Sequence, residues 1–269
     1  MTTLSTLNIP SEFRCTTEFL RRGYRPMNEI AFYINTLLAM YDLSLLPQQS
    51  TLPDWKLWEL PVYGVRVAAK TTQIRYAVWG LWQGVQRDAN AGFWPMALKI
   101  SWSGNPVAQV NVAPRQSLSS NITDGLALSA SDTSAVLQAL ALNTTTSGFG
   151  SSPDNLGAPH FQYNVTPNGR QITVKHLFQN AFATLVACAE QGPSTPFPGW
   201  ISDDFTFVPV LDARGRSLMV YGNLIKAMTY LATTAVEHHY FNEVDIEVVR
   251  DGVAIGHGRL RNPRGAGSE

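Results

Sequence analysis

Apolar residues recur along this chain with the period of an α-helix in several stretches and alternate with polar residues in others. One helical pattern is repeated after 148 residues, from position 30 to position 178. Its apolar positions are Ile30, Ile34, Leu37, Leu38 and Tyr41, and the repeat has Phe178, Phe182, Leu185, Val186 and Ala189. The alternating run Met96, Leu98, Ile100 is repeated at the same distance by Val244, Ile246, Val248. These matches predict an internal duplication, with two similar halves about a pseudo-two-fold axis.

The first half is expected to contain a helix, an extended segment, a second helix and a strand hairpin. We expect the first helix from Asn28 to about Leu45, the extended segment over residues 60–67 and the second helix from about Gln73. The hairpin strands are expected over Met96–Trp102 and Val107–Val112, with a turn at residues 103–106. Asn28 is a suitable N-cap because its side chain accepts a hydrogen bond from a free backbone N–H. Gly80 and Gly84 lie one turn apart on the second helix, which favours close packing against another backbone.

The second half is expected to repeat this order after an opening strand, whose counterpart in the first half is residues 13–20. The expected elements are a strand over Phe161–Val165 with a turn at Pro167–Gly169, a helix from Thr173 to about Glu190, a strand over residues 205–210, a helix opened by Asn223, and strands Phe241–Val249 and Val253–Leu260. The last hairpin turns at Asp251-Gly252, a pair that type I′ turns favour.

This order predicts an α+β fold of two αβαββ units, each an antiparallel sheet with helices on one face. The expected division is residues 1–113 for the first unit, 114–160 for a linker, 161–262 for the second unit and 263–269 for a tail. Two arrangements remain open: the sheets join edge to edge, or the helical faces pack together. Wide apolar arcs on the helices favour the common helical core.

The linker is rich in Ser and Thr and poor in charged and aromatic residues. Such a composition buries too little apolar surface to hold a fold of its own, so we expect little regular structure over residues 115–157. Residues 134–142 are the exception, because their apolar character suits a short docking helix. Rapid proteolysis between Ser117 and Ser152 would indicate a plain tether.

The formal net charge is zero, and charged residues make up 15% of the chain, below the ~25% typical of globular domains. We therefore expect no nucleic-acid partner, and self-association is easier for a chain without net charge. No stretch approaches the ~20 apolar residues of a membrane span. Residues 1–14 lack the features of a signal peptide, so the expected location is the cytoplasm, with secretion left open if a leader was removed. Cys15 and Cys188 allow one disulfide, which the sequence does not establish.

Familiar motifs of nucleophilic catalysis, phosphate binding and metal binding are missing from the sequence, so we expect no cofactor and no metal. His238 and His239 are weak catalytic candidates, since imidazole titrates near neutrality. As neighbours on a helix they point about 100° apart and do not easily share a metal ion. Asp245 and Glu247 are expected on the solvent face of a strand. Gly256-His257-Gly258 favours an edge strand that another group approaches closely, rather than a phosphate site.

Tryptophan is distributed unevenly, because only Trp200 of the seven lies in the second half. Core packing is the simpler interpretation. The competing interpretation is an aromatic surface for a ligand, another protein or a second copy. This surface would be formed by Trp79, Trp82 and Trp102, with Tyr221 from the second half.

The chain also resembles a known group of proteins. The first half contributes Arg75-Tyr-Ala-Val-Trp-Gly-Leu-Trp, Phe93 and Ile100-Ser-Trp-Ser-Gly; the second contributes Phe241-x-x-Val-x-Ile-x-Val, Gly256, Gly258 and Leu260. These segments resemble an uncharacterised family of paired αβαββ-repeat proteins from filamentous fungi. The resemblance covers both halves and excludes the linker. It implies the architecture and a fungal origin, and it implies no activity, catalytic residue or cofactor.

The expected function is therefore that of a non-enzymatic interaction protein or a self-assembling structural protein, whose partner is a second copy or another protein. The alternative is a small-molecule-binding protein or a cofactor-independent enzyme with a pocket between the two halves. Such a pocket would bring Trp79, Trp82 and Tyr221 together with His238 or His239.

Overall fold

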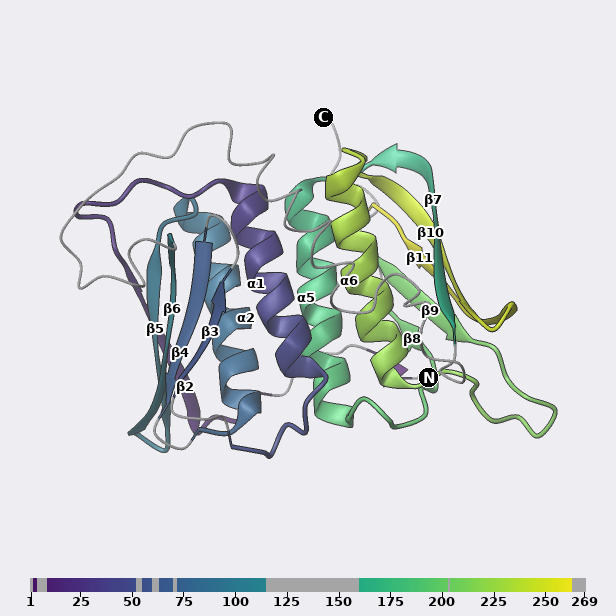
Figure 1. The fold of residues 1–269 in the computed structure, drawn as a ribbon, viewed down its shortest axis with the longest axis horizontal. Helices are drawn as coiled ribbons and strands as arrows, with labels where there is room; N and C mark the ends of the chain where they lie inside the picture. Colours follow the sequence, from purple (N-terminus) through teal and green to yellow (C-terminus); the bar gives the residue numbers. More distant parts are fainter. Residues whose placement is uncertain are drawn as a thin grey trace.

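The chain forms an α+β structure in which the helices lie between two β-sheets (Figure 1). The computed structural model describes residues 2–3, 9–51, 55–59, 63–69, 72–114, 160–202 and 204–262. The predictions for residues 115–157 and for the tail at 263–269 lie outside these ranges.

Each half contributes two helices and five strands to the described structure. The first half contains β2 (Phe13–Phe19), α1 (Glu29–Ser44), β3 (Trp55–Glu59), β4 (Tyr63–Ala69), α2 (Ile74–Ala91), β5 (Met96–Trp102) and β6 (Asn105–Pro114). The second half contains β7 (Phe161–Gln171), α5 (Val174–Gln191), β8 (Trp200–Ile201), β9 (Phe205–Pro209), α6 (Tyr221–Glu237), β10 (Asn242–Arg250) and β11 (Val253–Leu260). A short β1 (Thr2–Thr3) joins the second sheet.

The two halves share one topology. The first sheet has the order β2-β5-β6-β4-β3, with antiparallel neighbours throughout. The second has the order β7-β10-β11-β9-β8, again antiparallel, and β1 pairs with β8 in parallel. This agreement is what an internal duplication predicts, and the duplication itself stays a prediction.

Each half is a βαββαββ unit, so it contains two strands more than the predicted αβαββ unit. The opening strands β2 and β7 belong to the sheets as full members. In the first half the other missing strand is β3, because the predicted extended segment at residues 60–67 begins after Glu59. That segment includes most of β4 and no residue of β3.

Side-chain caps define the starts of two helices, α1 and α5. Asn28 and Thr173 each accept a hydrogen bond from the backbone N–H three residues on, at 3.0 and 3.1 Å, which confirms the predicted caps of α1 and α5. In contrast, α6 begins at Tyr221, two residues before Asn223, which was predicted to open it. Asn223 instead lies in the first turn, where its Oδ1 accepts a hydrogen bond from the N–H of Val220 at 3.0 Å.

Two predicted turns differ from the structure. The β5–β6 turn consists of Ser103 and Gly104 alone, with φ of 49° and 81°, so Asn105 already belongs to β6. At the predicted turn Pro167–Gly169, β7 does not end but continues to Gln171, with a register shift against β10 and a positive φ of 68° at Gly169. The predicted turn is therefore an irregularity within the strand. An edge strand tolerates proline there, since its outward-facing positions need no N–H for the sheet.

Glycines on α2 bring that helix close to its sheet. A Cβ atom on Gly80 would lie 2.5 Å from Ile100 Cδ1, and one on Gly84 would lie 2.7 Å from Leu98 Cδ1. Both partners are inward side chains of β5. The predicted close packing is confirmed, although the helix packs against side chains of a sheet instead of another backbone.

Glycines on β11 have the matching role in the second half. A Cβ atom on Gly256 would lie 2.7 Å from Phe207 Cε1, and one on Gly258 would lie 2.7 Å from Ile246 Cγ2. The close approach inferred from the sequence is confirmed. The edge position is wrong, because β11 lies between β9 and β10 in the interior of its sheet.

The helices of both halves form a common core. Contacts across the seam join α1 to α5, α1 to α6 and α2 to α5. Tyr33 of α1 stacks on Phe178 of α5, with ring centroids 4.9 Å apart and planes inclined by 12°. Buried apolar residues of both halves belong to one continuous cluster. The helical faces therefore pack together, and the described strands do not join the two sheets edge to edge.

We expect Gly258→Ala to destabilise the protein by about 1–3 kcal/mol, because the added methyl group overpacks the space held by Phe207 and Ile246. His257→Ala on the same strand is the matched control, since His257 is exposed and its loss should change stability by less than about 0.5 kcal/mol. Urea unfolding of both variants measures the difference. Equal effects would contradict the tight packing of β11.

Candidate functional site

The aromatic residues singled out in the sequence lie in separate places. Trp79 is buried, with 4% of its surface exposed, while Trp82 and Trp102 are half-buried in the first half. Tyr221 is buried in the second half, where its ring centroid lies 5.3 Å from that of Phe197. The four residues therefore do not form one aromatic surface.

Trp79 joins the two halves. Its Nε1 donates a hydrogen bond to Glu190 Oε1 of α5 at 3.0 Å. The Arg75 guanidinium lies 5.7 Å from the Trp79 ring centroid and 5.4 Å from that of Tyr76. Partial burial raises the pKa of Glu190, while Trp79 and Arg75 act in the opposite direction. Tyr76 in turn stacks on Trp102 at 5.1 Å, so the aromatic group fastens α2 to α5 and to its own sheet.

The two histidine candidates are remote from Tyr221. Tyr221 begins α6 and His238 is its C-cap, which separates them by the 17 residues of the helix, or about 25 Å. His238 and His239 are exposed, and His239 adopts a positive φ of 53° in the turn that follows the helix. The pocket predicted from the sequence does not bring these groups together.

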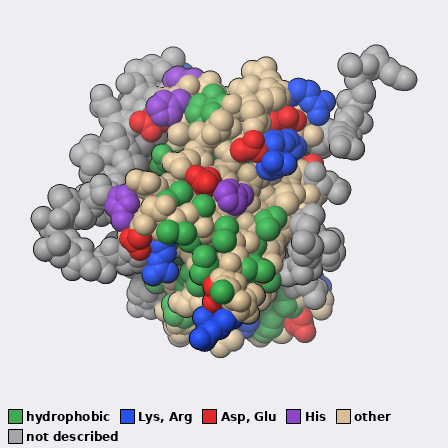
Figure 2. Space-filling model, turned by 90° about the vertical axis from the view of Figure 1, so that its right-hand side faces the viewer, with side chains coloured by type: hydrophobic (Ala, Val, Ile, Leu, Met, Phe, Trp, Pro, Cys, Tyr) green, Lys and Arg blue, Asp and Glu red, His purple; other side chains and the backbone are tan. Residues whose placement is uncertain are grey.

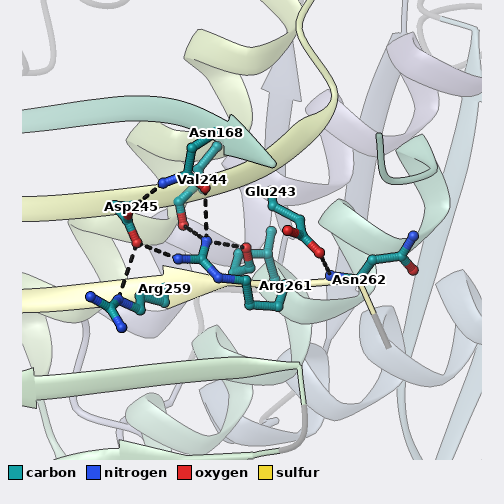
Figure 3. A network of polar contacts seen from close by, with 8 residues as sticks. Asn168, Glu243, Val244, Asp245, Arg259, Arg261 and Asn262 are labelled. Carbon is teal, nitrogen blue, oxygen red and sulfur yellow. Dashed lines mark hydrogen bonds and ion pairs between the residues drawn. The ribbon is translucent and has the colours of Figure 1, made fainter. Parts of the chain in front are cut away.

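A network of polar side chains lies where β11 ends, on the second sheet (Figure 3). Arg261 is at its centre. Its Nη2 donates to Asp245 Oδ1 at 2.7 Å, and its Nη1 donates to Asn168 Oδ1 at 3.0 Å and to the carbonyl oxygen of Val244 at 3.1 Å. Arg259 Nε lies 3.2 Å from the same Asp245 oxygen. As predicted, Asp245 faces outward from β10.

A neighbouring set of contacts holds the chain after β11. Glu243 Oε1 accepts a hydrogen bond from the backbone N–H of Asn262 at 2.9 Å and lies 3.5 Å from Arg170. The bond from Asn262 is the main cause that lowers the pKa of Glu243. His176 Nε2 lies 3.1 Å from the carbonyl oxygen of Arg261. These charged groups bind one another, so the network fastens β7, β10, β11 and α5 and is a poor candidate for catalysis.

Asp88 is a buried carboxyl group that the sequence pattern did not single out. It lies near the C-terminal end of α2, and its Oδ1 accepts a hydrogen bond from the backbone N–H of Trp94 at 2.9 Å. Its Oδ2 is buried without a partner among the described residues, as is the hydroxyl of Tyr33. Burial raises the pKa of Asp88 to about 7. A shifted carboxyl is a candidate acid or base, but this one is enclosed, which favours an effect on stability.

The cysteines are free and buried. Burial raises the pKa of Cys15 to about 11 and raises that of Cys188 further, which makes both thiols poor nucleophiles. In the described part of the chain, the side chains of His, Cys, Asp and Glu do not gather in groups of three that suit a metal ion. The described helices are too short or too polar to cross a membrane.

Exposed apolar side chains lie at the end of the second sheet where β9 ends and β11 begins, on the side of the molecule that faces the viewer in Figure 2. Four of the five exposed large hydrophobic residues among those described lie here. We call them the apolar cluster: Val208, Leu211, Leu218 and Val253, with exposed fractions of 47%, 55%, 36% and 58%. Backbone hydrogen bonds from Leu218 to Val210 and from Val210 to Ile255 hold the segments side by side, at 2.9 and 2.8 Å.

The sequence contains a weak signal for the apolar cluster. Val208 is an apolar residue at an outward position of the alternation set by Phe205 and Phe207, and Val253 directly follows the Asp251-Gly252 turn. Val208 lies opposite His257 of β11, and Val253 lies opposite Arg250 of β10, so their neighbours follow from strand pairing, which a pattern along one strand does not reveal.

Comparison with protein-family models, curated proteins and solved structures gives no match. The resemblance to a fungal family therefore stays a prediction. A functional interpretation rests on the geometry of the described residues, in which the apolar cluster holds four of the five exposed large hydrophobic side chains.

We expect Asp88→Asn to flatten the pH dependence of stability. The pKa of Asp88 is about 7 in the folded protein and ordinarily 3.8, so the unfolded chain loses this proton first. Stability is then highest at low pH and falls as the pH rises from about 4 to about 7. Between pH 5 and pH 8, the wild-type protein should lose roughly 2–3 kcal/mol relative to Asp88→Asn.

Urea unfolding at both pH values measures this loss. Glu12→Gln is the matched control, because it removes an exposed carboxyl and should leave the pH dependence unchanged. The same pH profile in wild type and Asp88→Asn would show that Asp88 does not titrate in this range.

Proposed function

We propose that this protein is a non-enzymatic interaction protein that associates with further copies of itself. The apolar cluster is the observation that carries the proposal. Covering its half-exposed valines and leucines would remove apolar surface from water, which stabilises a complex by about 25 cal/mol per Å². Contiguous exposed apolar side chains with polar residues around them are typical of interaction surfaces.

Charge favours a second copy as the partner. The chain has no net charge, so two copies do not repel one another at long range. One pair of opposite charges beside the apolar cluster is already formed within the chain. Arg216 Nη2 lies 2.8 Å from Asp212 Oδ2. The same surface can therefore meet itself across a two-fold axis, the commonest arrangement in soluble oligomers.

The alternative function, a pocket between the halves, receives less support from the packing. The seam that such a pocket would occupy holds the stacked rings of Tyr33 and Phe178. Trp79 is used to connect the halves, and His238 lies at the far end of α6 from Tyr221. A ligand at the seam would have to displace these contacts.

We expect Leu211→Asp and Val253→Asp each to weaken self-association, raising the dissociation constant by about tenfold. The reason is that each variant places a charge on a side chain that the contact would bury, at a cost of at least ~1.4 kcal/mol. Analytical ultracentrifugation over a range of concentrations measures the change.

Leu46→Asp is the matched control, because Leu46 is also an exposed large hydrophobic residue (37%) but lies in the first half after α1. It should leave the dissociation constant unchanged. If Leu46→Asp had the same effect, the association would be unspecific. A wild-type protein that remains monomeric at the highest soluble concentration would overturn the proposal.

A further inference from the structure

The second sheet has a long outer strand. β7 spans 11 residues and pairs with β10 alone among the described strands, so its other side is a sheet edge. Such an edge presents a row of backbone donors and acceptors that another strand can bind. Figure 1 shows β7 at the outside of the sheet, away from the seam between the halves.

The pairing with β10 shows which backbone groups of β7 face outward. The N–H of Asp251 donates to the carbonyl of His160 at 2.9 Å, so these two residues form a hydrogen-bonded pair. Hydrogen-bonded and non-hydrogen-bonded pairs alternate along antiparallel strands. The N–H and C=O groups of Phe161, Tyr163 and Val165 therefore point away from β10. Pro167 also occupies an outward-facing backbone position, so the N–H that proline lacks would not have bonded to β10.

The first part of this edge lacks the features that usually prevent strand pairing. Residues 161–166 contain no charged residue, no proline and no glycine. The corresponding edge strand of the first sheet, β2, carries the exposed charged residues Arg14 and Glu18. In β7 the protective residues come later, as Pro167 and Arg170, and they limit the accessible stretch to its first six residues.

We infer that β7 pairs in antiparallel fashion with β7 of a second copy, about a two-fold axis through Tyr163. This register sets Phe161 opposite Val165 and Tyr163 opposite its own equivalent, so all three outward residues exchange hydrogen bonds. The second sheets of two copies then form one continuous sheet.

Side chains on the outer face support a second copy as the occupant. Gln162 and Asn164 are both exposed, and this register sets each opposite the other. Asn164 Nδ2 donates to Glu247 Oε2 of β10 at 2.9 Å, so its Oδ1 is the atom that would accept a hydrogen bond from Gln162 of the second copy. Amide side chains both donate and accept hydrogen bonds, so Gln162 of one copy can bond to Asn164 of the other without a pair of opposite charges. The two-fold axis forms this contact twice, which a strand of another protein would not do.

The inference rests on the proposed self-association and adds a second contact to it. The apolar cluster lies on β9, β11 and the loop after β9, whereas the edge is β7. A chain with both contacts forms assemblies larger than a dimer. We expect dimers when either contact is removed and monomers when both are removed.

Val165→Pro tests the edge, because it removes an outward N–H and leaves the bonds to β10 in place. Val165→Ala is the matched control, since it loses the same side chain but keeps the N–H. We expect Val165→Pro to raise the dissociation constant of the edge contact by about tenfold or more relative to Val165→Ala, because each dimer loses two hydrogen bonds. Sedimentation in the Leu211→Asp background isolates this contact.

Amide hydrogen exchange of the full chain provides a second measurement with an internal control. The N–H groups of residues 162, 164 and 166 bind β10 and should be protected at every concentration. Those of Phe161, Tyr163 and Val165 should become protected only as copies associate.

The remaining outcomes separate the two proposals. Association without protection of the outward amides would overturn the edge contact and leave the proposed function standing. Protection in the monomer would show that another part of the same chain covers β7, which also overturns it. Absence of any association would overturn both.

Discussion

The burial of α1 on all sides is the constraint on which the rest of the structure depends. Twelve of its 16 residues are buried, and they surround the helix instead of forming one stripe. Two of its buried polar side chains bind the helix itself: Asn35 donates to the carbonyl of Ala31 and Thr36 to that of Phe32. One sheet covers only one side of such a helix. The second half must cover the other, so the stack of Tyr33 on Phe178 belongs to the folding of both halves.

Local chemistry was sufficient to predict much of this fold. The caps at Asn28 and Thr173 depend on backbone groups three residues away, and Asp251 and Gly252 form their turn with φ of 51° and 78°. The continuation of β7 through Pro167 was not predictable in this way. It depends on the pairing of β7 with β10, which lies about 80 residues further along the chain.

The candidate sites were even less predictable from local sequence than the strand boundaries. The excess of tryptophan in the first half suggested a surface, yet Trp79 is buried against α5 and bonded to Glu190. Asp88 has no distinctive neighbours in the sequence, and its environment comes from the packing around the end of α2. Val208 lies opposite His257 because β9 pairs with β11. Each of these roles is decided by residues that are distant in sequence, which a one-dimensional pattern does not contain.

The two edges of the second sheet are unequal, and this asymmetry limits how far the sheet can grow. At the edge opposite β7, the chain adds the two-residue strand β1 to the equally short β8. Two residues provide too few backbone groups to template another strand. A further strand can therefore be added only at the β7 edge, and pairing with β7 of a second copy occupies that edge. Addition along the hydrogen-bonding direction therefore terminates after one step, in contrast to the indefinite stacking of amyloid fibrils.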